Sequence, residues 1–172
     1  MQVQVASFST IKVNKSYYVH VDGVRRDLEN LYFQVDTGAS ISLIGLNTIC
    51  DEDSTRKNVL KTVIRKEVGT YGIIPFKERP RTVTGEQVEV FPCKLNGVSV
   101  MGTNPFTFFF CVYWGNISVP LLGYDYLDDC TYHHVAGGVV EILGVTEHPG
   151  RRFYSDNILD FNKVLDKYYS EI

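Results

Sequence analysis

The sequence lacks an apolar run long enough to cross a membrane. Its longest such run, Phe106–Trp114, is far shorter than the roughly 20 residues that a spanning helix needs. The first residues, Met1–Lys15, also lack the continuous apolar segment of a secretory signal peptide. We therefore expect a cytoplasmic protein that does not act at a membrane.

Closely spaced cysteine pairs are missing as well. The four cysteines lie far apart, at Cys50, Cys93, Cys111 and Cys130. This spacing does not fit a zinc ribbon and favours free thiols in a reducing compartment. No His-x-x-x-His motif is present, so we expect neither a metal ion nor another cofactor. Cys130, His133 and His134 are close in sequence, but a strand would turn the two histidines to opposite faces, which favours an ordinary strand.

A strong excess of one charge is also absent. The net charge of -3 over 172 residues gives little reason to expect a nucleic-acid partner, which basic residues would have to hold by its phosphates. A hydrophobic content of 44% and a charged content of 22% are ordinary for a soluble globular protein of about one domain. Aromatic residues are plentiful at 13%, which suits a β-rich core and an apolar cleft.

The most informative stretch places a carboxylate in a turn between two apolar runs. Strand-forming residues precede Asp36, Thr37 and Gly38 follow it, and Ile41–Ile44 continues as the second run. Gly38 supplies the backbone freedom that a tight turn needs. An acid at the end of a buried strand is costly to ionise unless a function uses it. The alternative is a plain strand-end turn in which Asp36 only caps backbone amides.

Asp36-Thr37-Gly38-Ala39, set between apolar runs, resembles the catalytic loop of the aspartic proteases. The single short chain is similar to their retropepsin-like branch. The resemblance implies that Asp36, Thr37 and Gly38 are catalytic and that Ala39 and Ser40 contact the substrate.

A second segment resembles the flap that closes over the substrate in this family. Residues 81–90 place strand-forming residues on both sides of a central glycine. The resemblance implies substrate contacts from Val83, Thr84, Gly85 and Glu86. An ordinary exposed hairpin is the alternative interpretation.

A third segment, residues 119–127, has two apolar residues and a glycine, followed by residues led by an acid that we expect to form a short helix. It resembles the family's segment that crosses beneath the catalytic loop. Gly123 would let the backbone pass close to the Asp36 strand, where a side chain would clash, and Asp125 would accept amides at the helix start. The resemblance thus implies that Leu122, Gly123 and Asp125 support the catalytic loop structurally.

The resemblance covers about residues 17–145 and implies a mainly β fold, the closed β-barrel of the acid proteases, within a domain of residues 1–150. Alternation and turn residues predict strands at Gln2–Phe8, Tyr17–Val21, Val88–Leu95, Val98–Met101, Pro105–Tyr113 and, as the final strand, Val139–Leu143. Asp22-Gly23 and Asn96-Gly97 are expected to be turns. The apolar run Phe106–Trp114 is expected to be buried on both faces.

Two helices are expected in addition to the barrel. The first is an inserted surface helix over about residues 54–67, capped by Asp53-Ser54, with a solvated basic face and a loop from Gly69 onward. The second lies in a C-terminal helical extension, residues 151–172, and is capped by Ser155. Its apolar stripe predicts that it docks on the barrel or on a partner subunit.

One Asp-Thr-Gly motif supplies one carboxylate, whereas aspartic proteases need two that share a site. The resemblance therefore implies a symmetric homodimer in which the two copies of Asp36 activate a water that hydrolyses a bond in a peptide or protein substrate. Two alternatives stay open. One is a non-catalytic dimerisation or peptide-binding module on the same fold, and the other is a protease held inactive by its extra helices.

Residues 29–34, Glu-Asn-Leu-Tyr-Phe-Gln, match the recognition sequence of a potyviral processing protease. The match is compatible with an engineered insertion and equally with a native strand. We infer no function from it.

Overall fold

The computed structural model describes residues 9–12, 18–21, 24–27, 32–35, 39–50, 53–73, 87–98, 106–117, 120–135, 139–145 and 150–171. The main-sheet strands are β1 (Ser9–Lys12), β4 (Tyr32–Val35), β5 (Leu43–Gly45), β6 (Val90–Val98), β7 (Phe106–Tyr113), β8 (Leu121–Leu122), β9 (Cys130–Val135), β10 (Val139–Val145) and β11 (Leu159–Asp160). A separate sheet pairs β2 (Tyr18–Val21) with β3 (Val24–Asp27). The helices are α1 (Asn47–Cys50), α2 (Ser54–Tyr71), α3 (Tyr124–Leu127) and α4 (Phe161–Glu171).

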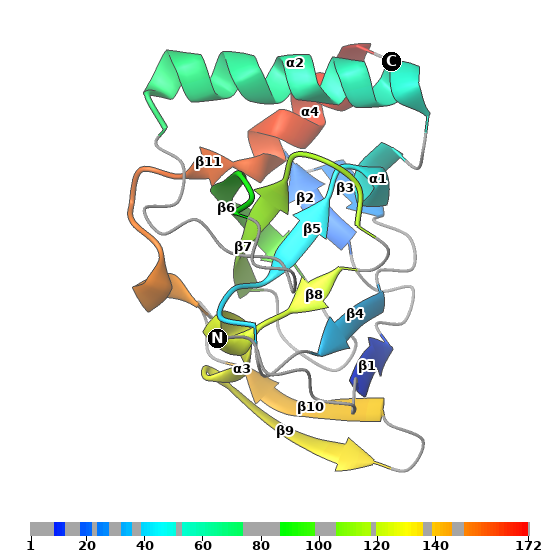
Figure 1. Cartoon of the computed structure of the whole chain (residues 1–172), viewed down its shortest axis with the longest axis vertical. Coiled ribbons are helices and arrows are strands. Elements are labelled where there is room, and N and C mark those ends of the chain that lie inside the picture. Colours follow the sequence, from blue (N-terminus) through cyan, green and yellow to red (C-terminus); the bar gives the residue numbers. More distant parts are fainter. Residues whose placement is uncertain are drawn as a thin grey trace.

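The main sheet is mixed, with nine strands in the order β11-β6-β7-β5-β8-β4-β1-β10-β9. Parallel pairs, such as β4 with β8 and β5 with β7, alternate with antiparallel pairs, such as β6 with β7 and β9 with β10. Figure 1 shows α2 and α4 stacked at one end of the molecule and the β9–β10 hairpin at the other.

The expected closure of the barrel is not found among the described residues. The sheet is open, because β11 pairs only with β6 and β9 pairs only with β10. β11 has only 2 residues before the chain enters α4, which leaves it too short to continue the ladder. The fold is therefore a mixed open sheet with helices.

The strand β6 corrects a second expectation. Asn96-Gly97 does not end a hairpin strand but lies inside β6, where the register with β7 shifts between Leu95 and Val98. Gly97 has a φ of 70°, so its conformational freedom serves a β-bulge here. The side chain of Asn162 fixes this bulge, because it accepts from the Asn96 nitrogen at 2.7 Å and donates to the Asn96 carbonyl at 3.1 Å.

The strand β7 is buried on both faces, as its apolar sequence predicts. Four alternate residues of β7 belong to the larger of two apolar cores, namely Phe106, Phe108, Phe110 and Val112. Buried side chains of α2 and α4 belong to the same core. The β7 residues between these four, Phe109 and Cys111, lie in a smaller core with Tyr154 and Ile158. The two faces of β7 therefore belong to two separate apolar layers.

The inserted helix α2 begins as predicted and ends later. Asp53 is the N-cap, and its side chain accepts from the backbone nitrogen of Arg56 at 3.0 Å. The helix continues past Gly69 to Tyr71 and stops at Gly72, whose φ is 59°. A glycine inside a helix costs only about 1 kcal/mol, which the buried apolar face of α2 outweighs.

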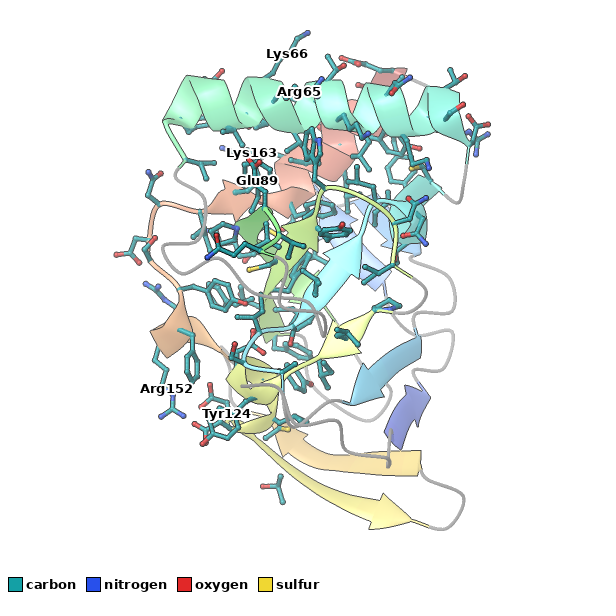
Figure 2. The ribbon with its side chains drawn as sticks, in the orientation of Figure 1. Arg65, Lys66, Glu89, Tyr124, Arg152 and Lys163 are labelled. Carbon is teal, nitrogen blue, oxygen red and sulfur yellow. The ribbon has the colours of Figure 1, made fainter. Side chains whose placement is uncertain are left out.

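The basic face of α2 is largely solvated, as predicted. Arg56, Arg65 and Lys66 are exposed, and Figure 2 shows Lys66 directed away from the sheet. Arg65 has a further contact, because its guanidinium lies over the Trp114 ring at 5.1 Å from the ring centroid.

The C-terminal segment is joined to the main sheet before its helix begins. The expected helix start at Ser155 is wrong, because residues 159 and 160 pair in parallel with Cys93 and Lys94 of β6, and α4 starts only at Phe161. The helix then packs against α2 and β6 of the same chain. Its buried side chains include Phe161, Val164, Leu165 and Tyr168. The prediction of a docked helix is confirmed.

The N-terminal strands agree in part with their sequence pattern. β2 is confirmed, whereas Gln2–Phe8 and the Asp22-Gly23 turn lie outside the described residues. Residues 32–34, the second half of the six-residue protease-site match, belong to β4, which pairs with β1 and β8. The predicted final strand is β10, but β11 follows it.

The four cysteines are free thiols, as predicted from their spacing. Within the part of the chain that the structure describes, no helix combines the length and apolarity needed to cross a membrane.

Candidate active site

The residues expected to carry the chemistry lie outside the described residues, namely Asp36, Thr37, Gly38, Val83, Thr84, Gly85 and Glu86. The described part of the candidate site consists of the loop that follows Gly38 and the β8–α3 segment that packs on it. In that loop Ala39 is half-buried and Ser40 is exposed.

The strand β8 lies between β4, which precedes the Asp-Thr-Gly motif, and β5, which follows it. Val35, the residue before Asp36, ends β4 and pairs with Leu122. On the other side, Leu43 of β5 pairs with Leu121. The sheet therefore brings the third sequence motif, at residues 119–127, next to both ends of the first.

Gly123 brings its backbone against residues 39–41, which follow the Asp-Thr-Gly motif. A Cβ atom at this position would lie 2.4 Å from the carbonyl oxygen of Ile41 and 2.9 Å from that of Ala39. The first two backbone nitrogens of α3 donate to the carbonyls of Ala39 and Ser40, at 2.8 and 3.2 Å. The close backbone approach expected of Gly123 is present, and it is made to residues 39–41.

Four donors surround the buried carboxylate of Asp125. Ser42 donates twice, from its backbone nitrogen to Oδ2 at 2.9 Å and from its hydroxyl to Oδ1 at 2.7 Å. The Tyr126 nitrogen donates to Oδ1 at 2.7 Å, and the Tyr154 hydroxyl donates to Oδ2 at 2.6 Å. Asp125 thus accepts one local amide, as expected, although Gly123 rather than Asp125 is the N-cap of α3.

The geometry also assigns the direction of these hydrogen bonds. The Gly123 nitrogen donates to Ser42 Oγ at 3.0 Å, so the Ser42 hydroxyl is an acceptor there and keeps its own proton for Asp125. The Cys111 thiol, 3.9 Å from the Tyr154 oxygen, donates to that hydroxyl. Two series of hydrogen bonds therefore donate toward the Asp125 carboxylate, one through Ser42 and one through Tyr154.

The Asp125 carboxylate has no cationic partner in the described part of the chain. Burial raises its pKa above the ordinary range, while hydrogen bonds from Tyr154 and Ser42 oppose that shift. Burial also raises the pKa of the Tyr154 hydroxyl well above its ordinary value, so the phenol keeps its proton at neutral pH. Neutral donors stabilise this acid in place of a salt bridge.

Three contacts hold the segment around Tyr154 to α3 and the residues after it. The Gly150 nitrogen donates to the Asp129 carboxylate at 2.7 Å, Arg152 forms an ion pair with Asp128, and Tyr154 reaches Asp125. Figure 2 shows Arg152 and Tyr124 on this same side of the molecule.

Sequence reasoning missed Ser42 and Tyr154. Ser42 had a signal, because it is the polar residue within the apolar run Ile41–Ile44. Tyr154 had none, because it is one of 11 tyrosines and meets Asp125 from 29 residues away.

The other candidate chemistry is weak in the described part of the chain, where no three His, Cys, Asp or Glu residues are grouped to hold a metal ion. Burial and the nearby Asp129 raise the pKa of the Cys130 thiol to about 12. This thiol therefore stays protonated at neutral pH and is a poor nucleophile. It begins the strand β9, which confirms the strand expected at residues 130–134.

Comparisons with known proteins find likenesses among solved structures. No family model matches the sequence, and no curated protein sequence matches it. Among solved structures, a retropepsin-like aspartic protease from Rickettsia conorii is similar, with 19% sequence identity and a TM-score of 0.38. The match covers 81% of this chain and 100% of the Rickettsia chain. A likeness of this strength establishes neither fold nor function.

Proposed function

We propose that this protein is a retropepsin-like aspartic endopeptidase that is active as a homodimer. The observation that carries the proposal is the packing of Gly123 on the loop that follows Asp36-Thr37-Gly38. Gly123 belongs to the third motif, and residues 39–41, which it contacts, directly follow the first motif although the two segments are far apart in sequence.

The packing supports catalysis because an acid dyad depends on the placement of its carboxylates. Residues 39–42 are held through their backbone carbonyls, by the Ser42 nitrogen and by the Ser42 hydroxyl. These contacts fix the position of residues 39–42, which directly follow the proposed catalytic residues. Catalytic groups need such positioning, because an error of about 1 Å can cost about a hundredfold in rate.

The proposed reaction uses Asp36 of both protomers. One Asp36 is ionised and takes a proton from a water, whose oxygen attacks the scissile carbonyl carbon. The protonated Asp36 of the partner subunit donates to the carbonyl oxygen, which forms a tetrahedral diol. Proton transfer to the amide nitrogen then lets the C–N bond break. Because the two acids share one proton, they titrate as a pair.

The remaining site residues would bind and orient the substrate. Thr37 would brace the two catalytic loops through its hydroxyl, and Gly38 would bring backbone close to the carboxylates. Ala39, Ser40 and the flap residues 83–86 would bind an extended peptide through strand-like hydrogen bonds. The exposure of Ser40 is compatible with this role.

The test compares the wild-type chain with Asp36→Asn on a peptide library, with and without pepstatin, an inhibitor of aspartic proteases. Asp36→Asn is expected to lower the rate by about a thousandfold or more, because it removes both acids of the pair. Asp156→Asn, a change at an exposed carboxylate, serves as the matched control and is expected to keep full activity.

Light scattering on each variant establishes whether it is dimeric at the assay concentration. Undiminished cleavage by Asp36→Asn would exclude the aspartic-protease mechanism. A wild-type dimer that binds peptides without cleaving them would favour the non-catalytic module instead.

A further inference from the structure

We propose that Tyr154 is a positioning residue for the Asp36 loop, which it reaches through Asp125 and Ser42. The inference rests on the proposed peptidase function and goes beyond it. It makes the C-terminal segment part of the machinery that sets the geometry of the catalytic loop.

Hydrogen bonds connect Tyr154 to Ser42 through the Asp125 carboxylate. The Tyr154 hydroxyl donates to Asp125 Oδ2 at 2.6 Å, and the same oxygen accepts from the Ser42 nitrogen at 2.9 Å. Ser42 is also bonded through its hydroxyl to the other carboxylate oxygen. A single buried carboxylate therefore joins a tail residue to a residue of the loop.

The carboxylate in turn depends on Tyr154. Asp125 is completely buried and has no Lys or Arg partner in the described part of the chain. A buried acid must be satisfied by hydrogen bonds, and its oxygens offer about four acceptor sites, which match the four donors around it. Loss of one donor leaves a buried acceptor unsatisfied on the same carboxylate that holds Ser42.

Tyr154 itself is held rigidly. Its ring stacks on Phe109 with centroids 5.7 Å apart, and only 6% of the residue is exposed. The chain before it is held by Gly150 and Arg152, whose partners are Asp129 and Asp128. The chain after it enters β11, which pairs with β6. The position of the Tyr154 hydroxyl is therefore fixed, because the chain is held in place both before and after Tyr154.

The loop that follows Gly38 cannot easily shift in one part alone. The Gly123 nitrogen donates to Ser42 Oγ at 3.0 Å, and a Cβ at Gly123 would already clash with Ile41. Interiors so closely packed transmit displacements. A change at Asp125 would therefore be transmitted to residues 39–42, which directly follow Asp36-Thr37-Gly38.

The test uses Tyr154→Phe, which removes the hydroxyl and keeps the ring. Tyr113→Phe is the matched control, because Tyr113 packs against the same small core and the change is chemically identical. All proteins are assayed as dimers at a temperature where each is fully folded. Tyr154→Phe is expected to lower kcat by about tenfold with little change in KM, and to shift the pH profile of kcat/KM, because the carboxylate pair is displaced.

Ser42→Ala provides a second variant that acts on the same carboxylate. If Tyr154 and Ser42 act as one unit, the double variant loses less kcat than the product of the two single losses. Independent, fully multiplicative losses would contradict a shared route through Asp125. An unchanged kcat and pH profile in Tyr154→Phe, with only a lower melting temperature, would overturn the positioning role.

Amide hydrogen exchange separates this inference from the proposed function. Tyr154→Phe is expected to lower protection at Ser42 and at the first residues of α3, whereas Tyr113→Phe leaves it unchanged. Tyr154→Phe could lower protection in a protein that shows no pepstatin-sensitive cleavage. That result would contradict the peptidase proposal and support the coupling between the C-terminal segment and the loop. Unchanged protection would sink the coupling whatever the activity.

Discussion

A Cβ atom at Gly123 would lie 2.4 Å from the carbonyl oxygen of Ile41. The φ of Gly123 is -100°, which any residue adopts, so space rather than backbone conformation restricts this position to glycine. The restriction follows from the path of the chain, because β8 lies between β4 and β5 and leads directly into α3. The segment that follows Asp36-Thr37-Gly38 and the segment 121–125 are therefore packed backbone to backbone.

We first predict that Gly123→Ala destabilises the protein by about 3 kcal/mol or prevents folding, because the added methyl must displace backbone rather than a flexible side chain. Chemical denaturation monitored by circular dichroism measures the change in the free energy of unfolding.

Gly69→Ala is the matched control for this substitution. Gly69 lies inside α2 with no atom near its Cβ position, so alanine there is expected to stabilise the protein by about 0.5–1 kcal/mol. A tolerated Gly123→Ala, with stability close to wild type, would contradict the close approach of the two backbones.

Our second prediction concerns the dependence of activity on concentration. Each chain carries one Asp-Thr-Gly motif, so a monomer lacks the second carboxylate. Specific activity is therefore expected to fall when the protein is diluted to concentrations below the dissociation constant of the dimer. Peptidase assays at serial dilutions, paired with light scattering, test this, and a monomer with constant specific activity would argue against a shared site.

Third, the stability that Asp125 confers is expected to decrease as pH rises. In the unfolded chain this carboxyl titrates at about 3.9, whereas burial raises its pKa in the folded state. Between these two values the folded protein binds more protons than the unfolded one, so rising pH favours unfolding. The contribution of Asp125 is fully present below the unfolded pKa and is lost as pH passes through the raised one.

Denaturation of the wild type and Asp125→Asn at a series of pH values from about 3.5 to 7 isolates this effect, because all other titrating groups are shared. We expect the wild type's stability relative to the variant to shrink with rising pH. A relative stability that grows instead would show that the four donors favour the ionised acid more than burial opposes it.

Fourth, Leu165→Ala is expected to cost about 2–5 kcal/mol, because Leu165 is completely buried where α4 meets the larger core. Thermal and chemical unfolding provide the measurement. Ser170→Ala, an exposed change on the same helix, should leave stability nearly unchanged. Equal effects of the two substitutions would mean that α4 is not docked.

Elements governed by neighbouring residues were predictable from the sequence. The apolar run of β7 predicted burial on both faces, Asp53 predicted the start of α2, and the spacing of the cysteines predicted free thiols. The short helix after Gly123 was likewise expected from the order of residues in the 119–127 segment, through its resemblance to a family segment. Each of these features depends on side-chain size, periodicity or a capping group that lies within a few positions along the chain.

The tertiary structure alone decided features that depend on a distant partner. Ser155 could have capped a helix, but pairing of residues 159–160 with β6 delayed α4 to Phe161. Asn96-Gly97 suits a turn or a bulge equally well, and the side chain of Asn162, 66 residues away, fixes the bulge.

The environment of Asp125 was decided in the same way. Its carboxylate needs donors, which the sequence makes plain, but only the packing of the C-terminal segment determines that Tyr154 is one of them. The sequence by itself determined which groups must be satisfied and which faces must be buried. The choice of partner came from the tertiary structure, because hydrogen bonds and apolar contacts between distant segments depend on how the whole chain packs. The local preferences of residues for helix, strand or turn do not specify that packing.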